Sequence, residues 1–281
     1  MMIDRQRATL SALLVISMLL AGCNGAETET DPSEVPGCMN ENAENFDPDA
    51  TVSDESCEYK SSVSDEPAQE KISFPNNDVC DNTNPDHCLL PYPSSAFLLD
   101  DPSTVTGHRL HIKGSAIPDS ASAPSEEFSV INARDGHSPS TQIFTTFESV
   151  PDVSGLASQD NIAISTEVNH GSVLLNMDSG QIIEHWVEVS ARTQEGEPTL
   201  VHLRSIRGLD HDTQYAVAFR GLVDDSGNEI GPFDAFRALR DGNGTDSVQI
   251  EGSRAGYEAM FLALSNVGFE RSSIQSAWWF H

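Results

Sequence analysis

The sequence predicts a mainly β protein: an immunoglobulin-like antiparallel sandwich with one or two C-terminal helices, preceded by a disordered tether and a small disulfide module. Three observations support this prediction. From about Phe74 onward, short apolar runs rich in β-branched and aromatic residues alternate with turn residues. One later segment has apolar residues at helical spacing. Residues 24–36 and 60–72 are too polar and acidic to bury a core, which predicts a tether and a linker.

Six segments of the main domain, residues 73–281, have the composition of strands. They are bounded by Gly, Asp, Asn and Ser, with clear turn signals at 178–180 and 224–228. Strands that recur this often are typical of a sandwich of antiparallel sheets. The expected strands are Thr141–Phe147, Asn161–Thr166, Ser172–Met177, Ile182–Val189, Thr199–Leu203 and Gln214–Arg220.

One helix is expected after these strands. Ser253 is a candidate N-cap, and Gly268 is the expected stop. Between them the apolar residues Tyr257, Met260, Phe261, Leu264 and Val267 recur at helical spacing, which is typical of a core-facing stripe. The final residues, 277–281, form an aromatic strand-like run, and we expect the main domain to be incomplete at this end.

The first residues of the chain have the pattern of an export signal. Two arginines precede an apolar run, Leu10–Leu20, which is shorter than the roughly 20 apolar residues that a membrane-spanning helix needs. The run ends in Leu-Ala-Gly-Cys, which resembles the lipobox of bacterial lipoproteins. That resemblance implies that residues 1–22 are a signal peptide and that Cys23 carries diacylglycerol and palmitate. An ordinary secretory signal with a chance cysteine is the alternative reading.

The residue after Cys23 is Asn24, not the aspartate that retains lipoproteins in the inner membrane of enteric bacteria. The resemblance therefore favours an outer-membrane or cell-surface location, with the protein lipid-anchored and extracytoplasmic. Acyl chains give stable anchoring because each buried CH₂ contributes about 0.8 kcal/mol.

The remaining cysteines are Cys38, Cys57, Cys80 and Cys88. Four thiols in an exported chain indicate disulfides, with three possible connectivities. Local pairing of Cys38 with Cys57 and of Cys80 with Cys88 is favoured, because each pair closes a short polar loop. A zinc site is the alternative, although no CxxC or paired-histidine spacing accompanies the cysteines.

The chain is strongly acidic, with a formal net charge of −29 over 281 residues. A nucleic-acid partner is excluded on this ground, because phosphate binding needs a basic surface. Acidity by itself indicates a solvated surface more than an acidic active site, although divalent cations gather at any such surface.

Residues 37–59 (GCMNENAENFDPDATVSDESCEY) resemble the short cysteine-bounded repeats of marine bacterial surface proteins. Their pattern places glycine before the final Ser-Cys pair, where this chain has Glu55. Asp47, Asp49 and Asp54 suggest a calcium loop, but the central glycine of an EF-hand is missing. We expect no other cofactor and no metal site.

The most distinctive sequence motifs of the main domain lie in the segment Cys80–Ile112 (CDNTNPDHCLLPYPSSAFLLDDPSTVTGHRLHI). These motifs are similar to the start of large secreted bacterial proteins, many of them assigned as esterases or lipases. Their N-terminal domain resembles that of the bacterial virulence-factor lipases. Further motifs match that domain in the same order along the chain: Asp135–Pro139 (DGHSP), His185–Glu188 (HWVE), Tyr215–Ala218 (YAVA) and Phe236–Gly242 (FRALRDG).

In such relatives catalysis would belong to a downstream α/β-hydrolase domain with a G-x-S-x-G elbow. The nearest motif here, Gly136–Ser140 (GHSPS), has serine in place of the second glycine. Pro139 also removes a backbone N–H that the elbow would use for its oxyanion hole. We therefore interpret His137 and Ser138 as loop structure and expect no catalytic residue in this chain. If the chain is part of a longer protein, the resemblance implies a carboxylic-ester hydrolase.

Other polar residues are also interpreted as structural. His108 and His111 are expected on opposite faces of a strand, and Glu167 and His170 in a turn. The aspartates around the second cysteine pair are expected to be solvated loop carboxylates and turn caps; they are Asp81, Asp86, Asp100 and Asp101.

Three functional hypotheses remain. The first is a membrane-anchored lipoprotein whose sandwich is the non-catalytic N-terminal module of a lipase- or esterase-like family. The second is a free-standing adhesion or ligand-binding lipoprotein, with an unknown surface glycan, lipid or protein ligand. The third is a fragment of a secreted lipase or esterase.

Overall fold

The computed structural model describes residues 34–58, 71–116, 129–193 and 197–281. The chain divides into two compact units, Met1–Glu66 and Pro67–His281, and the boundary falls within the expected linker. Cys23, the expected signal peptide and most of the tether lie outside the described residues. Within the described residues, no helix combines the length and apolar character needed to cross a bilayer.

The small unit is held by short-range contacts and one disulfide. Strand β1 (Pro36–Gly37) pairs in parallel with β2 (Val52–Ser53). Asn45 links two ends of this unit, donating to the Ser56 carbonyl and accepting from the Glu58 N–H at 2.6 and 2.7 Å. The disulfide joins Cys38 to Cys57, 19 residues apart.

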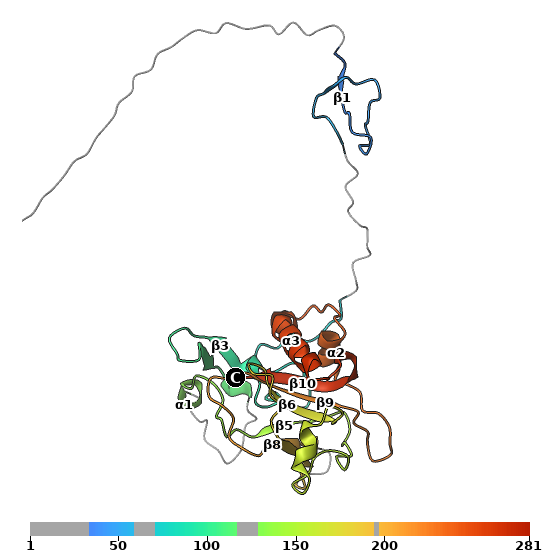
Figure 1. The fold of residues 1–281 in the computed structure, drawn as a ribbon. Coiled ribbons are helices and arrows are strands. Elements are labelled where there is room, and N and C mark those ends of the chain that lie inside the picture. The colour runs from blue at the N-terminus through green and yellow to red at the C-terminus, as the bar shows by residue number, and fades with distance from the viewer. Residues whose placement is uncertain (1–33, 59–70, 117–128, 194–196) are drawn as a thin grey trace, which may run out of the picture. The chain divides into compact units, whose positions relative to one another are not determined.

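The large unit contains two three-stranded antiparallel sheets, which confirms the predicted mainly β architecture (Figure 1). One sheet has the order β5-β8-β7 and the other β10-β9-β6. The strands are β5 (Ile143–Thr145), β6 (Ser172–Asn176), β7 (His185–Val189), β8 (Val201–Ser205), β9 (Tyr215–Arg220) and β10 (Ile274–Phe280).

The core of the sandwich lies between these sheets. Val187 and Leu203 from the first sheet share one buried cluster with Leu174, Val217 and Trp278 from the second. Along the first four residues of β7 and of β8, buried and partly exposed residues alternate, as expected for a sheet with one solvent-exposed face. Strand β6 is buried at every position, so the β10-β9-β6 sheet must be covered on its other face too.

Two helices provide that cover, as Figure 1 shows. They are α2 (Asp234–Arg240) and α3 (Val248–Asn266). Helix α3 buries Ile250, Tyr257, Met260, Phe261 and Leu264 against the sheet, four of which belong to the predicted stripe. The expectation of one or two C-terminal helices is confirmed.

Arg220, at the end of β9, ties the C-terminal end of α3 to the loop before β6. Its guanidinium donates to the carbonyls of Gly268 (2.6 Å), His170 (3.2 Å) and Val168. It also lies 3.9 Å above the centre of the Phe269 ring. A planar fork of donors is required to reach three carbonyls at once.

Shorter elements complete the large unit. They are η1 (Ser95–Phe97), β3 (Leu98–Asp100), β4 (His108–Leu110), η2 (Gly114–Ala116), α1 (Ser129–Asn132), η3 (Ile162–Thr166) and η4 (Arg271–Ser273).

Two sequence expectations were wrong in detail. The segment 161–166 forms the 3₁₀ helix η3, since Asn161 accepts from the Ser158 N–H and starts a turn there. Short apolar runs do not distinguish strand from helix by periodicity. Helix α3 is capped by Ser247, which accepts from the Ile250 N–H, whereas Ser253 lies one turn inside the helix.

Candidate functional site

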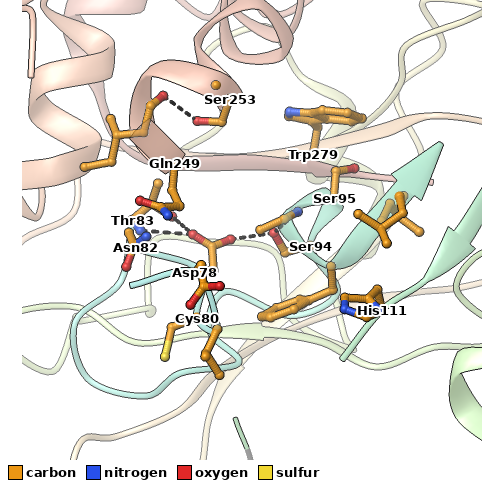
Figure 2. A pocket seen from close by; sticks show the side chains of 18 of the residues that line it. Asp78, Cys80, Asn82, Thr83, Ser94, Ser95, His111, Gln249, Ser253 and Trp279 are labelled. Carbon is orange, nitrogen blue, oxygen red and sulfur yellow. Dashed lines mark hydrogen bonds between the residues drawn. The ribbon is translucent and has the colours of Figure 1, made fainter. Parts of the chain in front are cut away.

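The candidate site is a cavity of about 520 Å³ in the large unit (Figure 2). Its walls come from the loop 78–83, from η1 and β3, from residues just after β4, from the first half of α3 and from Trp279 on β10. Segments as far apart in sequence as Asp78 and Trp279 therefore meet around one space. This volume lies within the range of about 300–1,000 Å³ that is usual for small-molecule sites.

Asp81 organises the wall nearest the second disulfide and is only 4% exposed. One of its oxygens accepts from the Thr83 hydroxyl (2.6 Å) and the Thr83 N–H (3.0 Å), and the other accepts from the Ser94 hydroxyl. Its own N–H donates to the Cys88 carbonyl. Through these bonds Asp81 joins the disulfide loop to the start of η1.

Burial raises the pKa of the Asp81 carboxyl, and the hydrogen bonds from Ser94 and Thr83 oppose that rise. Burial, with the charge of Asp81 as a second cause, also raises the pKa of the Tyr257 phenol. The expectation that Asp81 is a solvated loop carboxylate is therefore wrong. Asp101 does cap a turn as expected, accepting from the Ser103 N–H at 3.0 Å.

Helix α3 contributes a wall with two glycines four residues apart, Gly252 and Gly256. A Cβ on Gly256 would lie 2.6 Å from Cζ2 of Trp279, so this glycine allows the indole to lie directly against the helix backbone. A Cβ on Gly252 would meet nothing within 4 Å. Gly252 is a solvent-exposed position at the edge of the lining.

The lining combines apolar and polar groups. Phe97 and Ile250 are buried hydrophobic residues of the wall, and Trp279 is partly buried. The Ser95 hydroxyl oxygen is buried and has no hydrogen-bond partner among the described residues. The only lysine of the lining, Lys113, lies 2.6 Å from the Asp78 carboxylate. Such a lining is suited to binding a small molecule.

The four predicted disulfide cysteines pair locally, as expected. Cys38 bonds to Cys57 and Cys80 bonds to Cys88. Of the two bridges, the second belongs to the candidate site, because Cys80 lines the cavity and the Cys88 carbonyl holds Asp81. The lipidation residue, Cys23, lies outside the described residues.

The His137–Ser138 pair, which belongs to the segment nearest to a nucleophile elbow, is not arranged as a base and nucleophile. His137 Nε2 donates to the Ser94 carbonyl at 3.3 Å, and burial lowers the pKa of this imidazole to about 4. The Ser138 oxygen accepts from the Ser140 N–H at 3.3 Å, in a turn. A general base must reach the proton that it removes, and the hydrogen bonds of these two side chains run to Ser94 and Ser140 and not to each other.

The possible metal ligands do not converge. His108 lies against the His281 ring, with centroids 5.1 Å apart, whereas His111 lines the cavity. Asp47 and Asp54, of the suspected calcium loop, each accept from a backbone N–H two residues later. The part of the chain that the structure describes contains no group of three or more His, Cys, Asp or Glu side chains placed to hold a metal ion.

A second buried polar cluster lies where β6 and β7 begin. Glu167 and His170 do share a turn, with the His170 N–H bonded to the Glu167 carbonyl at 3.0 Å. His185 is fully buried, donates from Nδ1 to the Ile183 carbonyl and accepts at Nε2 from the Ser172 hydroxyl, both at 2.8 Å. Burial is the main cause that lowers the pKa of His185 to about 4, and nearby His170 adds to it. Both ring nitrogens of His185 are engaged in hydrogen bonds, so we interpret this cluster as structural.

Sequence reasoning missed most of the residues that line the cavity. Asp81 and Trp279 were noticed, but the first was expected in solvent and the second in a plain terminal strand. Nothing in the local sequence distinguishes Ser95 from its neighbours.

Comparisons with known proteins do not add a relative. No family model matches the chain, no curated protein matches it, and no solved structure matches it. The functional argument therefore depends on the chain's own residues.

Proposed function

We propose that this chain is a lipid-anchored, extracytoplasmic protein of the outer membrane or cell surface. Its large unit would serve as the non-catalytic module of a lipase- or esterase-like family. The observation that supports this best is the pair of disulfides, one in each unit. Such bonds form and persist in oxidising compartments outside the cytoplasm. The Leu-Ala-Gly-Cys word supplies the anchor in this proposal, with Cys23 as its attachment point.

Metabolic labelling tests the anchor. The full chain is produced in a bacterium fed an alkyne-bearing palmitate, and incorporation is compared between the wild type, Cys23→Ala and the neighbouring control Asn24→Ala. We expect label and membrane recovery for the wild type and for Asn24→Ala, and neither for Cys23→Ala. Label that persists in Cys23→Ala overturns the proposed anchor.

An ester assay tests the non-catalytic part of the proposal. The arrangement of His137 and Ser138 supports it, because neither side chain is directed at the other by a hydrogen bond. We expect no turnover of short-chain p-nitrophenyl esters by the purified chain. Clear turnover that Ser138→Ala abolishes would contradict this function.

A second candidate function is a free-standing ligand-binding lipoprotein. The cavity beside Asp81 favours it, because the cavity has the volume of a small-molecule site. The two candidates share the anchor and differ in whether the large unit binds a ligand.

A further inference from the structure

A second hollow of the large unit, of about 680 Å³, lies along β7 and β8. Its lining joins residues of these strands to the segments 139–142 and 206–209. It is separate from the cavity beside Asp81, because the two share no lining residue. Its volume also lies within the range that is usual for small-molecule sites.

The charged residues of this hollow differ from those of the chain as a whole. The sequence has 44 acidic residues and 15 lysines and arginines. The charged residues of the lining are instead two arginines, Arg204 and Arg207, and one carboxylate, Glu188. Most of such an acidic surface repels an anion, so an anionic ligand would bind where positive side chains gather.

Both arginines retain hydrogen-bond donors. Arg204 Nε donates to Glu188 at 2.5 Å, and this is the only hydrogen bond of its guanidinium among the described residues. Arg207 uses one terminal nitrogen on Asp210, at 3.2 Å. A guanidinium carries five N–H groups, so each arginine has several donors left after its ion pair. The two side chains are 35% and 43% exposed, so a ligand can reach them from solvent.

Trp186 adds an aromatic surface beside Arg204. The two residues stand directly opposite each other on β7 and β8, on the face of the sheet that is not buried in the core. The indole Nε1 donates to Glu188 at 3.4 Å, and the hydrogen bond from Arg204 lowers the pKa of that carboxyl. Glu188 is therefore ionised at neutral pH and positions both of its neighbours.

We propose that this hollow binds a phosphate monoester that carries a ring. A carboxylate has two oxygens in one plane, which a single guanidinium fork already matches. Two arginines at one hollow suit a phosphate group better, because it offers three free oxygens and a charge of roughly −1.5 to −2 at neutral pH. Arg204 and Arg207 would donate to these oxygens, and the ring of the ester would lie against the Trp186 indole.

This site goes beyond both proposed functions, because neither the anchor nor the cavity beside Asp81 contributes a residue to it. A failed binding experiment at this hollow leaves the labelling of Cys23 and the ester assay unaffected. Their failure, in turn, leaves the phosphate site unaffected.

The test uses the purified full chain and calorimetric titration with phenyl phosphate. Phenol lacks the anion, and benzoate replaces it with a carboxylate. Arg207→Gln removes one guanidinium at an exposed position, Arg204→Lys keeps a charge but removes the planar fork, and Trp186→Leu removes the indole. Arg192→Gln is the control, since it removes the same charge at an exposed position outside the lining. Urea unfolding checks that every variant is folded.

We expect phenyl phosphate to bind the wild type and Arg192→Gln equally, and phenol and benzoate to bind at least about tenfold more weakly. Arg207→Gln and Arg204→Lys should each weaken the binding of phenyl phosphate by about tenfold or more, as for the loss of a hydrogen bond to a charged group. Trp186→Leu should weaken it about two- to tenfold. The proposal is overturned if phenyl phosphate does not bind, if phenol or benzoate binds as tightly, or if Arg207→Gln or Arg204→Lys binds like the wild type.

Discussion

Acid should destabilise the large unit through His185. This imidazole is fully buried and neutral, with Nδ1 donating to a carbonyl and Nε2 accepting from Ser172. Its pKa in the fold is about 4, against the ordinary value of 6.5. Above pH 6.5 neither state takes up a proton there, so the full stability is present. As the pH falls from 6.5 to about 4, the unfolded chain binds the proton and the folded one does not, so stability is lost.

The size of the effect follows from the two pKa values. Each pH unit between them corresponds to about 1.4 kcal/mol, so the whole interval amounts to about 3 kcal/mol. His137, with a pKa also near 4, acts in the same direction. The raised pKa of Asp81 acts in the opposite direction, because a carboxyl whose pKa is higher in the fold than in the unfolded chain adds stability as the pH falls.

A difference measurement isolates His185 from these other groups. Urea unfolding is followed between about pH 7.5 and 4.5 for the wild type, His185→Gln and the exposed control His211→Gln. His185→Gln should be less stable at pH 7.5 by about 1–3 kcal/mol, because buried hydrogen bonds are lost. Its stability should then fall less with acid, so that the wild type and the variant converge near pH 4.5. Parallel curves for the wild type and His185→Gln would refute the reasoning, and the control should run parallel to the wild type.

Other substitutions test the backbone and Arg220. Glu55 has a φ of 61° at the position where similar repeats have glycine, so Glu55→Gly should stabilise the small unit by about 1 kcal/mol, measured as greater resistance of its disulfide to dithiothreitol. Gly252→Ala should stabilise the large unit by roughly 0.5–1 kcal/mol in urea unfolding, whereas Gly256→Ala should destabilise it by about 1–3 kcal/mol, because its Cβ would lie 2.6 Å from Trp279. If both glycine substitutions stabilised the unit, or both destabilised it, the packing of Trp279 against Gly256 alone would be contradicted. Arg220→Lys should lower the melting temperature by an amount equivalent to about 1–3 kcal/mol, since one ammonium cannot reach three carbonyls, and an unchanged melting temperature would show that the fork is dispensable.

The elements of the large unit could be predicted where neighbouring residues in the sequence determine them. Alternating or continuous apolar runs located β6, β7, β8 and β9, and the two cysteine pairs closed loops short enough to pair locally. The start of α3 was predicted too late, because Gly252 lowers helix propensity and Ser253 follows it as a plausible cap.

The candidate site was beyond sequence reasoning for a different reason. Asp81 stands in a polar, disulfide-bounded loop, where solvent exposure is the sound local expectation. Its burial results from contact with η1, with Ser94 donating to it, and from the approach of Tyr257 on α3. Such long-range contacts leave no trace in spacing or composition.

The two disulfides also make oxidation a step in the maturation of this protein. In the small unit Cys38 and Ala43 are the only buried hydrophobic residues among those described, so a bond worth about 3 kcal/mol outweighs the rest of its core. In the large unit the sandwich has its own core, but the loop that carries Asp81 into the cavity wall is closed by Cys80 and Cys88. A newly made, reduced chain would thus lack the small unit and an ordered cavity wall. Both would be completed only once the four thiols have been oxidised, so the redox state of the surroundings decides when the fold is finished.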